Sequence, residues 1–354
     1  DCIYVTPDRN PAAPGYAALG AHVDDMLAVG DAAGHRKIKD TLEKKFKITQ
    51  KAEPDVITGV QIERNRKKRY LKIHQEAYVQ ELLSKHDMSD CKQASTPMDP
   101  GTARALMLLP TEEHDPAVIL LFQALVGALI WLAIKTRPDM LFTVNLLSRF
   151  LRCATRRHLD LARGCPLRYL KGTASWGIAY AAGCGEWVLS GSSDSDLAGD
   201  LKTSRSTLGW WGKLGAYGTV LAHCGLDRKI STATGQAETY AMQGLVKDVV
   251  WLRTLLAELG FPMKDATQLG TDNDGVFKQS TKTVNHTAAK HYRIAQAYIR
   301  QHWRELIIKV LSVNTNDNAA DMFTKALNAG PFLHHRHGIM GPQSADELST
   351  QHRA

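Results

Sequence analysis

The sequence lacks the cysteine patterns of secreted disulfide scaffolds and of metal fingers. Its six cysteines are scattered over 354 residues, and none belongs to a C-x-x-C pair. Such scattering is typical of a reduced, intracellular protein. The chain also has no internal repeat, no low-complexity segment and no signal peptide at its start. Because it opens at Asp1 without Met, inside a predicted strand, we expect a fragment of a longer polyprotein.

Long apolar runs are also scarce, and a single stretch is a candidate for crossing a membrane. Residues 117–134 read AVILLFQALVGALIWLAI, which just reaches the lower limit of about 17 to 18 residues for a spanning helix. Gln123 interrupts the run, and no second run accompanies it. Both observations favour a helix buried in a large core, and a membrane span stays open as the alternative.

What the sequence does contain is many apolar residues and an excess of positive charge. Hydrophobic residues make up 44% of the chain and charged residues 23%. The length predicts two or three domains of roughly 150 residues each. The formal net charge of +8 favours a polyanionic partner, although charge speaks to association and not to fold.

Hydrophobic patterning predicts hairpins and helices in the first half of the chain. Two apolar runs within 17–30 flank a pair of aspartates, and two further runs lie within 57–73, so both segments are expected to be β-hairpins. Proline and glycine within 97–101 predict a boundary loop. The helical pattern covers residues 33–48, 75–86, 117–135, 139–152 and 158–171.

After Gly172 the pattern becomes that of a mixed α/β domain. From residue 186 on, three strands, a helix, a strand, a helix, a strand and a helix predict a sheet covered by helices. Strands are expected at 176–181, 186–193, 207–214, 217–223, before Asp272 and at 306–313, and helices at 234–259, 288–305 and 318–327. From Gly330 on, the chain is rich in histidine, glycine and polar residues and is predicted to be a loose tail.

Three acids of this domain occupy positions that surface acids do not favour. Asp194 and Asp272 each follow a predicted strand, and ligands gather at strand ends in α/β sheets. Glu238 lies in the first turn of the long predicted helix. It precedes Ala241 and Leu245 by three and seven residues, so it shares the apolar face that points inward.

A fourth acid, Asp321, opens the last predicted helix beside Met322 and Phe323, which are expected to face the core. Buried carboxylates are costly when unpaired, and neighbouring ones repel or take up protons. A pair of Mg²⁺ ions about 4 Å apart resolves both problems and suits two-metal hydrolysis of a phosphodiester. Taken singly, each acid is better explained as a helix cap or a solvated side chain.

Five segments of this domain resemble the ribonuclease H domain of copia-type retrotransposons, in the family's order and spacing. They are SDSDLAGD (193–200), GQAETYA (235–241), TDNDGVF (271–277), KHYRIAQAYIR (290–300) and NDNAADMFTKAL (316–327). Upstream segments resemble the palm end, thumb and connecting region of the reverse transcriptase. They are HVDDMLAVG (22–30), GVQIER (59–64), SDCKQASTPMDP (89–100), ALVGALIWLAIKTRPDMLFTV (124–144) and LRYLKGT (167–173). The resemblance covers residues 1 to about 330.

The resemblance implies an α/β (α+β) fold class: a palm and thumb remnant, then a ribonuclease H-like mixed five-stranded sheet with flanking helices. It divides the chain into the C-terminal part of the palm with the start of the thumb (1–100), a helical thumb and connection region (101–180), the ribonuclease H domain (181–330) and a flexible tail (331–354). It also implies a cytoplasmic location, in a virus-like particle, with a nuclear stage.

The implied catalytic and metal-binding acids are Asp194, Glu238, Asp272 and Asp321, the four that the residue pattern selects. The implied activity is endonucleolytic cutting of the RNA strand of RNA–DNA hybrids with two Mg²⁺ ions, Mn²⁺ being the alternative metal. The implied partners are the hybrid, its backbone and the rest of the Pol polyprotein, with no membrane. Residues 313–320 contain no histidine, so proton transfer is expected to fall to water or to metal-bound groups.

Asp24 and Asp25 resemble the paired aspartates that hold Mg²⁺ in reverse transcriptases. The alternative is a solvated two-aspartate turn, although apolar residues on both sides make it less favourable. His22 stands where the family usually has tyrosine, which departs from the pattern for primer positioning. The third catalytic aspartate would lie before Asp1, so we predict no independent DNA synthesis by this chain.

Basic residues of two regions are predicted to follow a nucleic-acid backbone, which fixes position without reading sequence. The predicted nucleic-acid-binding residues are Arg64, Arg66, Lys67, Lys68 and Arg69 of the second hairpin, with Lys290 and His291. A solvated turn is an equal alternative for the hairpin, and a packing role is favoured for His291. Recognition of a hybrid would rest on groove shape and 2′-hydroxyls.

Two other classes of function remain open. One is a decayed or domesticated element that binds nucleic acid without catalysis, which His22, the apolar stretch 119–122 and the unusual GCPL segment (164–167) motivate. The other is a DDE-type integrase with a ribonuclease H fold, which the upstream reverse-transcriptase motifs disfavour.

Overall fold

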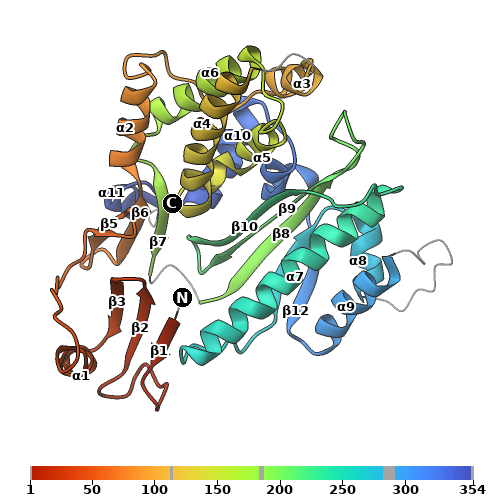
Figure 1. Ribbon diagram of the computed structural model, residues 1–354. Helices are drawn as coiled ribbons and strands as arrows, with labels where there is room; N and C mark the ends of the chain where they lie inside the picture. Colours follow the sequence, from red (N-terminus) through yellow and green to blue (C-terminus); the bar gives the residue numbers. More distant parts are fainter. Residues whose placement is uncertain (1, 112–114, 183–186, 282–291, 352–354) are drawn as a thin grey trace.

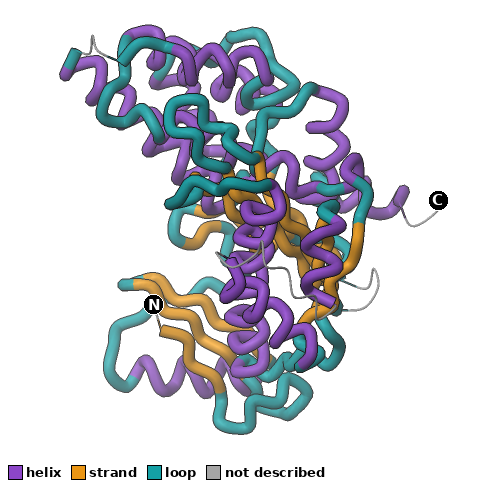
Figure 2. The backbone as a smooth tube through the Cα atoms, turned by 90° about the vertical axis from the view of Figure 1, so that its right-hand side faces the viewer, coloured by secondary structure: helices purple, strands orange, loops and turns teal. Residues whose placement is uncertain are grey.

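Three β-sheets and the helices around them make up the computed structural model, which describes residues 2–111, 115–182, 187–281 and 292–351. The first sheet is antiparallel, in the order β1 (Cys2–Val5), β2 (Ala17–His22) and β3 (Asp25–Gly30), and α1 (Ala32–Glu43) follows it. The second, also antiparallel, has the order β4 (Val56–Ile57), β5 (Val60–Asn65), β6 (Tyr70–His74) and β7 (Gly177–Ala181). Both predicted hairpins are therefore confirmed. The first sheet lies at one end of the molecule, beside the N-terminus (Figure 2).

The third sheet is mixed and has the strand order β10-β9-β8-β11-β12. Its strands β8 (Leu189–Asp196), β9 (Thr207–Leu214) and β10 (Thr219–Leu226) are antiparallel, whereas β11 (Thr267–Thr271) and β12 (Ile308–Ser312) run parallel to β8. The helix α7 (Thr234–Glu258) lies across one face, with α8 (Asp274–Thr281) and α9 (Arg293–Arg304) beside it (Figure 1). This confirms the predicted five-stranded mixed sheet with flanking helices.

A helical layer lies above the sheets in Figure 1 and shares a core with the face of the third sheet opposite to α7. It consists of α2 (Glu76–Lys85), α3 (Pro100–Leu108), α4 (Pro116–Lys135), the 3₁₀ turn η1 (Pro138–Met140), α5 (Leu141–Ser148) and α6 (Arg156–Gly172). The helix α4 is the one described helix that is long and apolar enough to cross a membrane, by length and composition. One face of α4, with Phe122 and Leu125, is buried in this core, whereas Leu120, Leu121 and Ile134 are exposed, so the expectation of a buried helix holds for that face alone.

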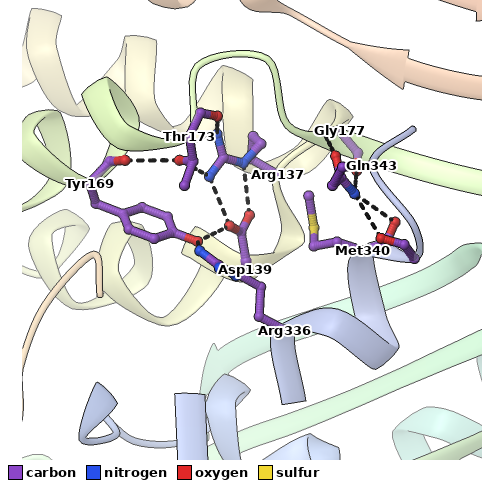
Figure 3. A network of polar contacts seen from close by, with 9 residues as sticks. Arg137, Asp139, Tyr169, Thr173, Gly177, Arg336, Met340 and Gln343 are labelled. Atoms are coloured by element: carbon purple, nitrogen blue, oxygen red, sulfur yellow. Dashed lines mark hydrogen bonds and ion pairs between the residues drawn. The ribbon is translucent and has the colours of Figure 1, made fainter. Parts of the chain in front are cut away.

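The prediction of a loose tail is wrong. The chain after Gly330 continues α10 (Ala329–Met340) and then forms α11 (Ala345–Gln351). Three large apolar side chains of α10, Phe332, Ile339 and Met340, are buried. The side chain of Gln343 accepts a hydrogen bond from the Gly177 amide at 2.9 Å and donates one to the Gly177 carbonyl at 3.0 Å (Figure 3). A few buried side chains are enough to attach this segment to the rest of the protein, and its overall composition does not show which residues these are.

Two other predicted segments differ from the structure. The expected boundary loop contains the start of α3, because the Asp99 carboxylate accepts the Thr102 amide at 3.0 Å and caps a helix that opens with Pro100. The last predicted helix, 318–327, is instead the 3₁₀ turn η4 (Ala319–Phe323), which follows another 3₁₀ turn, η3 (Thr315–Asp317). The helix expected from residue 288 is described only from Arg293 on, since residues 288–291 lie outside the described residues.

Candidate active site

Three carboxylates from separate elements converge at one edge of the third sheet. Asp194 lies two residues before the end of β8, and Asp272 follows directly on β11, the parallel neighbour of β8. Glu238 faces both from the second turn of α7, which begins at Thr234 as predicted, so Glu238 lies one turn further into the helix than expected. One oxygen of each side chain lies within 4.8 Å of the others, a spacing that could hold a metal ion. Parallel neighbouring strands bring their carboxyl ends together, which is why two of the acids meet here.

The fourth predicted acid, Asp321, lies beside this group but outside that 4.8 Å set. It is 8% exposed, on the turn η4, which packs against β8 and β9. The Thr324 hydroxyl donates a hydrogen bond to Asp194 Oδ2 and also lies 3.1 Å from the carbonyl oxygen of Asp321. The structure therefore brings all four predicted acids to one place, with Thr324 linking the segments of Asp194 and Asp321.

Local sequence explains how η4 approaches the sheet so closely. Gly209 pairs with Asp194 across β9 and β8. A Cβ atom at Gly209 would lie 2.7 Å from a methyl group of Thr324 and 2.8 Å from Phe323 Cβ, so only glycine fits. The Asn318 side chain caps η4 at the Ala320 amide and donates to the Ser193 carbonyl at 3.1 Å. These contacts hold Asp321 next to β8.

Burial of the clustered carboxylates disfavours their charged forms and raises their pKa values. Burial, followed by the charge of Asp321, raises the pKa of Asp194 to about 6. Burial, followed by the charges of Asp194 and Asp272, raises the pKa of Glu238 to about 8, although the Ser195 amide donates to Glu238 Oε1 at 3.3 Å. Among the described residues, neither Glu238 Oε2 nor Asp321 Oδ1 has a hydrogen-bond partner. Buried oxygens without partners in a cluster of acids are compatible with the binding of a divalent cation.

One cation of the chain itself reaches the cluster. Lys325 Nζ lies 3.0 Å from Asp321 Oδ2, and the charges of Asp194, Asp321 and Asp196 raise the pKa of Lys325 even though burial lowers it. Sequence reasoning named neither Lys325 nor Thr324 as a functional residue. The signal that could have found Lys325 is its position four residues after Asp321, within the ADMFTK string.

The other predicted metal ligands, Asp24 and Asp25, are exposed at the turn between β2 and β3. The Asp25 carboxylate accepts the Thr58 amide at 3.1 Å. Within the part of the chain that the structure describes, no third ligand joins the pair in a metal-holding group.

The predicted basic residues of the second hairpin are all exposed around the turn between β5 and β6. Two of them pair with acids of the chain, Arg66 with Glu53 at 2.8 Å and Lys68 with Asp346. The two remaining predicted nucleic-acid-binding residues, Lys290 and His291, lie outside the described residues.

Comparisons with known proteins agree with the sequence motifs. No family model matches the chain. The chain is 31% identical over 320 residues to the retrovirus-related Pol polyprotein from transposon TNT 1-94 of Nicotiana tabacum, which covers 90% of this chain and 24% of that protein. It is 30% identical over 312 residues to the corresponding polyprotein from transposon RE1 of Arabidopsis thaliana, covering 88% and 21%. The chain thus spans less than a quarter of the length of these relatives.

Two solved structures resemble part of the chain. The ribonuclease H1 of the archaeon Halobacterium salinarum is 20% identical, covers 38% of this chain and 93% of its own, and has a TM-score of 0.28. The LC11 ribonuclease H1 in complex with an RNA/DNA hybrid is 14% identical, with coverages of 38% and 93% and a TM-score of 0.30.

Proposed function

Since the chain belongs to the retrovirus-related Pol polyproteins of copia-type transposons, we propose that it carries a ribonuclease H that cuts the RNA strand of RNA–DNA hybrids. The observation that carries the proposal is the convergence of Asp194, Glu238 and Asp272 within 4.8 Å, with Asp321 beside them. Four acids from separate segments lie together at one edge of a sheet, where their mutual repulsion opposes folding. Their proximity is therefore better explained by binding of cations than by stabilisation of the fold.

The donor set fits hard divalent cations such as Mg²⁺ and Mn²⁺, which prefer carboxylate oxygens. Asp194, Glu238 and Asp272 would hold one ion, and Asp194 with Asp321 the second. The two buried oxygens without partners, on Glu238 and Asp321, are the positions that such ions would satisfy. When bound, a pair of divalent ions supplies Lewis-acid activation of water and neutralises charge on the leaving oxygen.

The residues of the chain itself act by orienting these ligands. The Thr324 hydroxyl directs one oxygen of Asp194, and the Ser195 amide directs one oxygen of Glu238, so each carboxylate presents its other oxygen in a fixed direction. Because η4 packs closely against β9 at Gly209, Asp321 is held at the same edge of the sheet as the other three acids. Preorganisation of this kind is what two-metal phosphodiester cleavage requires of a protein scaffold.

We further infer that residues 1–180 are the palm end, thumb and connecting region of a reverse transcriptase and that this chain alone synthesises no DNA. Asp24 and Asp25 are exposed and lack a third ligand among the described residues. A primer-extension assay on the purified chain should therefore yield no product, and extension of the primer would refute this part of the proposal.

The nuclease activity is tested with the purified chain, an end-labelled RNA–DNA hybrid and Mg²⁺. We expect internal cuts in the RNA strand of the hybrid and none in single-stranded RNA. Asp194→Asn should abolish cleavage, whereas Asp160→Asn, an exposed acid of α6, should cleave like the unmodified protein. Salt-sensitive binding of the hybrid without any cleavage would instead support the alternative of a nucleic-acid-binding protein without catalysis.

A further inference from the structure

Lys325 is placed where a metal ion would otherwise balance the charge of Asp321. Its ammonium lies 3.0 Å from Asp321 Oδ2, and the Asp321 side chain is only 12% exposed. The other oxygen of Asp321 is buried without a partner among the described residues. Among the described residues, Lys325 is therefore the cation paired with this carboxylate, and its charge also acts on neighbouring Asp194.

We propose that the Lys325 ammonium occupies the second cation position of the cluster, so that the resting protein binds one divalent ion at the trio and a second ion enters only by displacing Lys325. This inference rests on the proposed function, because it assumes that the trio binds a metal. It assigns Lys325 a positioning role, in which the lysine sets when the second ion binds.

The charges of the cluster support this order of binding. Four ionised carboxylates carry four negative charges, so one divalent ion together with the ammonium leaves a single negative charge in place. Two divalent ions together neutralise the four acids, so the charge of Lys325 is no longer needed. The ammonium is then repelled by two ions at close range. Within the described part of the chain, Lys325 forms its ion pair with Asp321 and none with the Asp194–Glu238–Asp272 trio, so the trio is the natural first site.

The surroundings of Lys325 leave space and a second acidic partner for its ammonium after displacement. Its side chain is 41% exposed, so the four-carbon stem is free to turn. It lines a cavity of about 280 Å³ together with Asp196, whose half-buried carboxylate makes no hydrogen bond or ion pair that the described residues reveal. Asp196 is thus a second partner within reach of the same ammonium.

The test is calorimetric titration of Mn²⁺ into the full chain, without nucleic acid. We expect one bound ion for the unmodified protein and for Lys325→Arg, and two for Lys325→Met, with the affinity for the second ion raised at least tenfold. Electron paramagnetic resonance should then show coupled Mn²⁺ ions in Lys325→Met alone. Lys51→Met is the matched control, since it removes an exposed lysine of another i,i+4 pair with aspartate and should bind one ion.

The outcomes separate this inference from the function on which it rests. Two ions bound by the unmodified protein, or one ion bound by Lys325→Met, would overturn the role of Lys325 and leave the nuclease proposal standing. No ion bound by any form would refute the proposed metal site itself. Circular dichroism checks that each variant is folded, and Lys325→Gln replaces Lys325→Met if the latter is not.

Discussion

The Arg137 guanidinium donates two hydrogen bonds to the Asp139 carboxylate, from Nε to Oδ1 at 3.0 Å and from Nη2 to Oδ2 at 2.8 Å (Figure 3). Both side chains are buried, and neither is more than 1% exposed. Arg137 also donates to the carbonyl and the hydroxyl oxygen of Thr173, each at 2.8 Å. The Tyr169 hydroxyl donates to Asp139 and accepts from Arg336 of α10. The pair therefore connects η1, the end of α6 and the C-terminal helix that follows the candidate active site.

Arg137→Met should destabilise the protein strongly. It leaves the Asp139 carboxylate buried, with the Tyr169 hydroxyl as its remaining side-chain partner among the described residues. Breaking a buried pair on one side costs roughly 3 to 5 kcal/mol. Urea unfolding followed by circular dichroism measures the change. A double variant, Arg137→Met with Asp139→Leu, should recover much of the loss, because it leaves no unpaired charge. A loss below about 1 kcal/mol for the single variant would contradict the account.

Asp194→Asn should separate activity from stability. We expect hybrid cleavage to fall roughly a hundredfold or more, since removing a metal ligand forfeits several kcal/mol of transition-state stabilisation. In the absence of divalent ions the same change removes a repelling charge next to Asp321. The melting temperature in EDTA should therefore stay the same or rise by a few degrees. A large drop in the EDTA melting temperature would mean that activity is lost through unfolding.

The metal-free protein should become less stable as the pH rises from about 7 to 8. Below pH 7, burial-lowered pKa values such as those of His158 and His223 act in the opposite direction, because the unfolded state then binds more protons at these histidines. The folded pKa of Glu238 is raised to about 8 and that of Asp194 to about 6, so the folded state holds protons that the unfolded state releases near pH 4. Stability is then lost wherever the folded state binds more protons than the unfolded one. Thermal melts in EDTA at pH 5 to 9 measure this, and Glu238→Gln should flatten the upper part of the curve. If Glu238→Gln leaves the pH dependence of the melting temperature unchanged, the Glu238 carboxyl does not cause the loss of stability.

Gln343→Ala should weaken the attachment of the C-terminal segment. Its side chain makes hydrogen bonds in both directions with the Gly177 backbone and donates to the Met340 and Gly341 carbonyls. We expect a loss of about 1 to 2 kcal/mol in the free energy of unfolding and faster hydrogen exchange in β7 and α10. Gln301→Ala, whose side chain bonds only to exposed Glu305 on its own helix, is the control and should change little. Unchanged exchange in β7 would rule out the docking role.

Local patterns explain the parts of the fold that could be predicted. The two apolar runs within 17–30 and the apolar stripe of α7 depend on residues close in sequence, and both elements are found as expected. The segment after Gly330 and the turn η4 could not be predicted in the same way. The helix α10 is stabilised by burial of Phe332 and Met340 in a core whose other members come from residues far upstream.

For the candidate site, the sequence by itself determined which acids follow strands and face inward, because strand ends and helical periodicity are local properties. Only the tertiary structure decided that Asp194, Glu238 and Asp272 meet within 4.8 Å, that two of the cluster's oxygens are left without partners, and that Lys325 reaches Asp321. The physical reason is that burial, repulsion and distance depend on strand pairing and on the packing of η4, which join residues up to 130 positions apart.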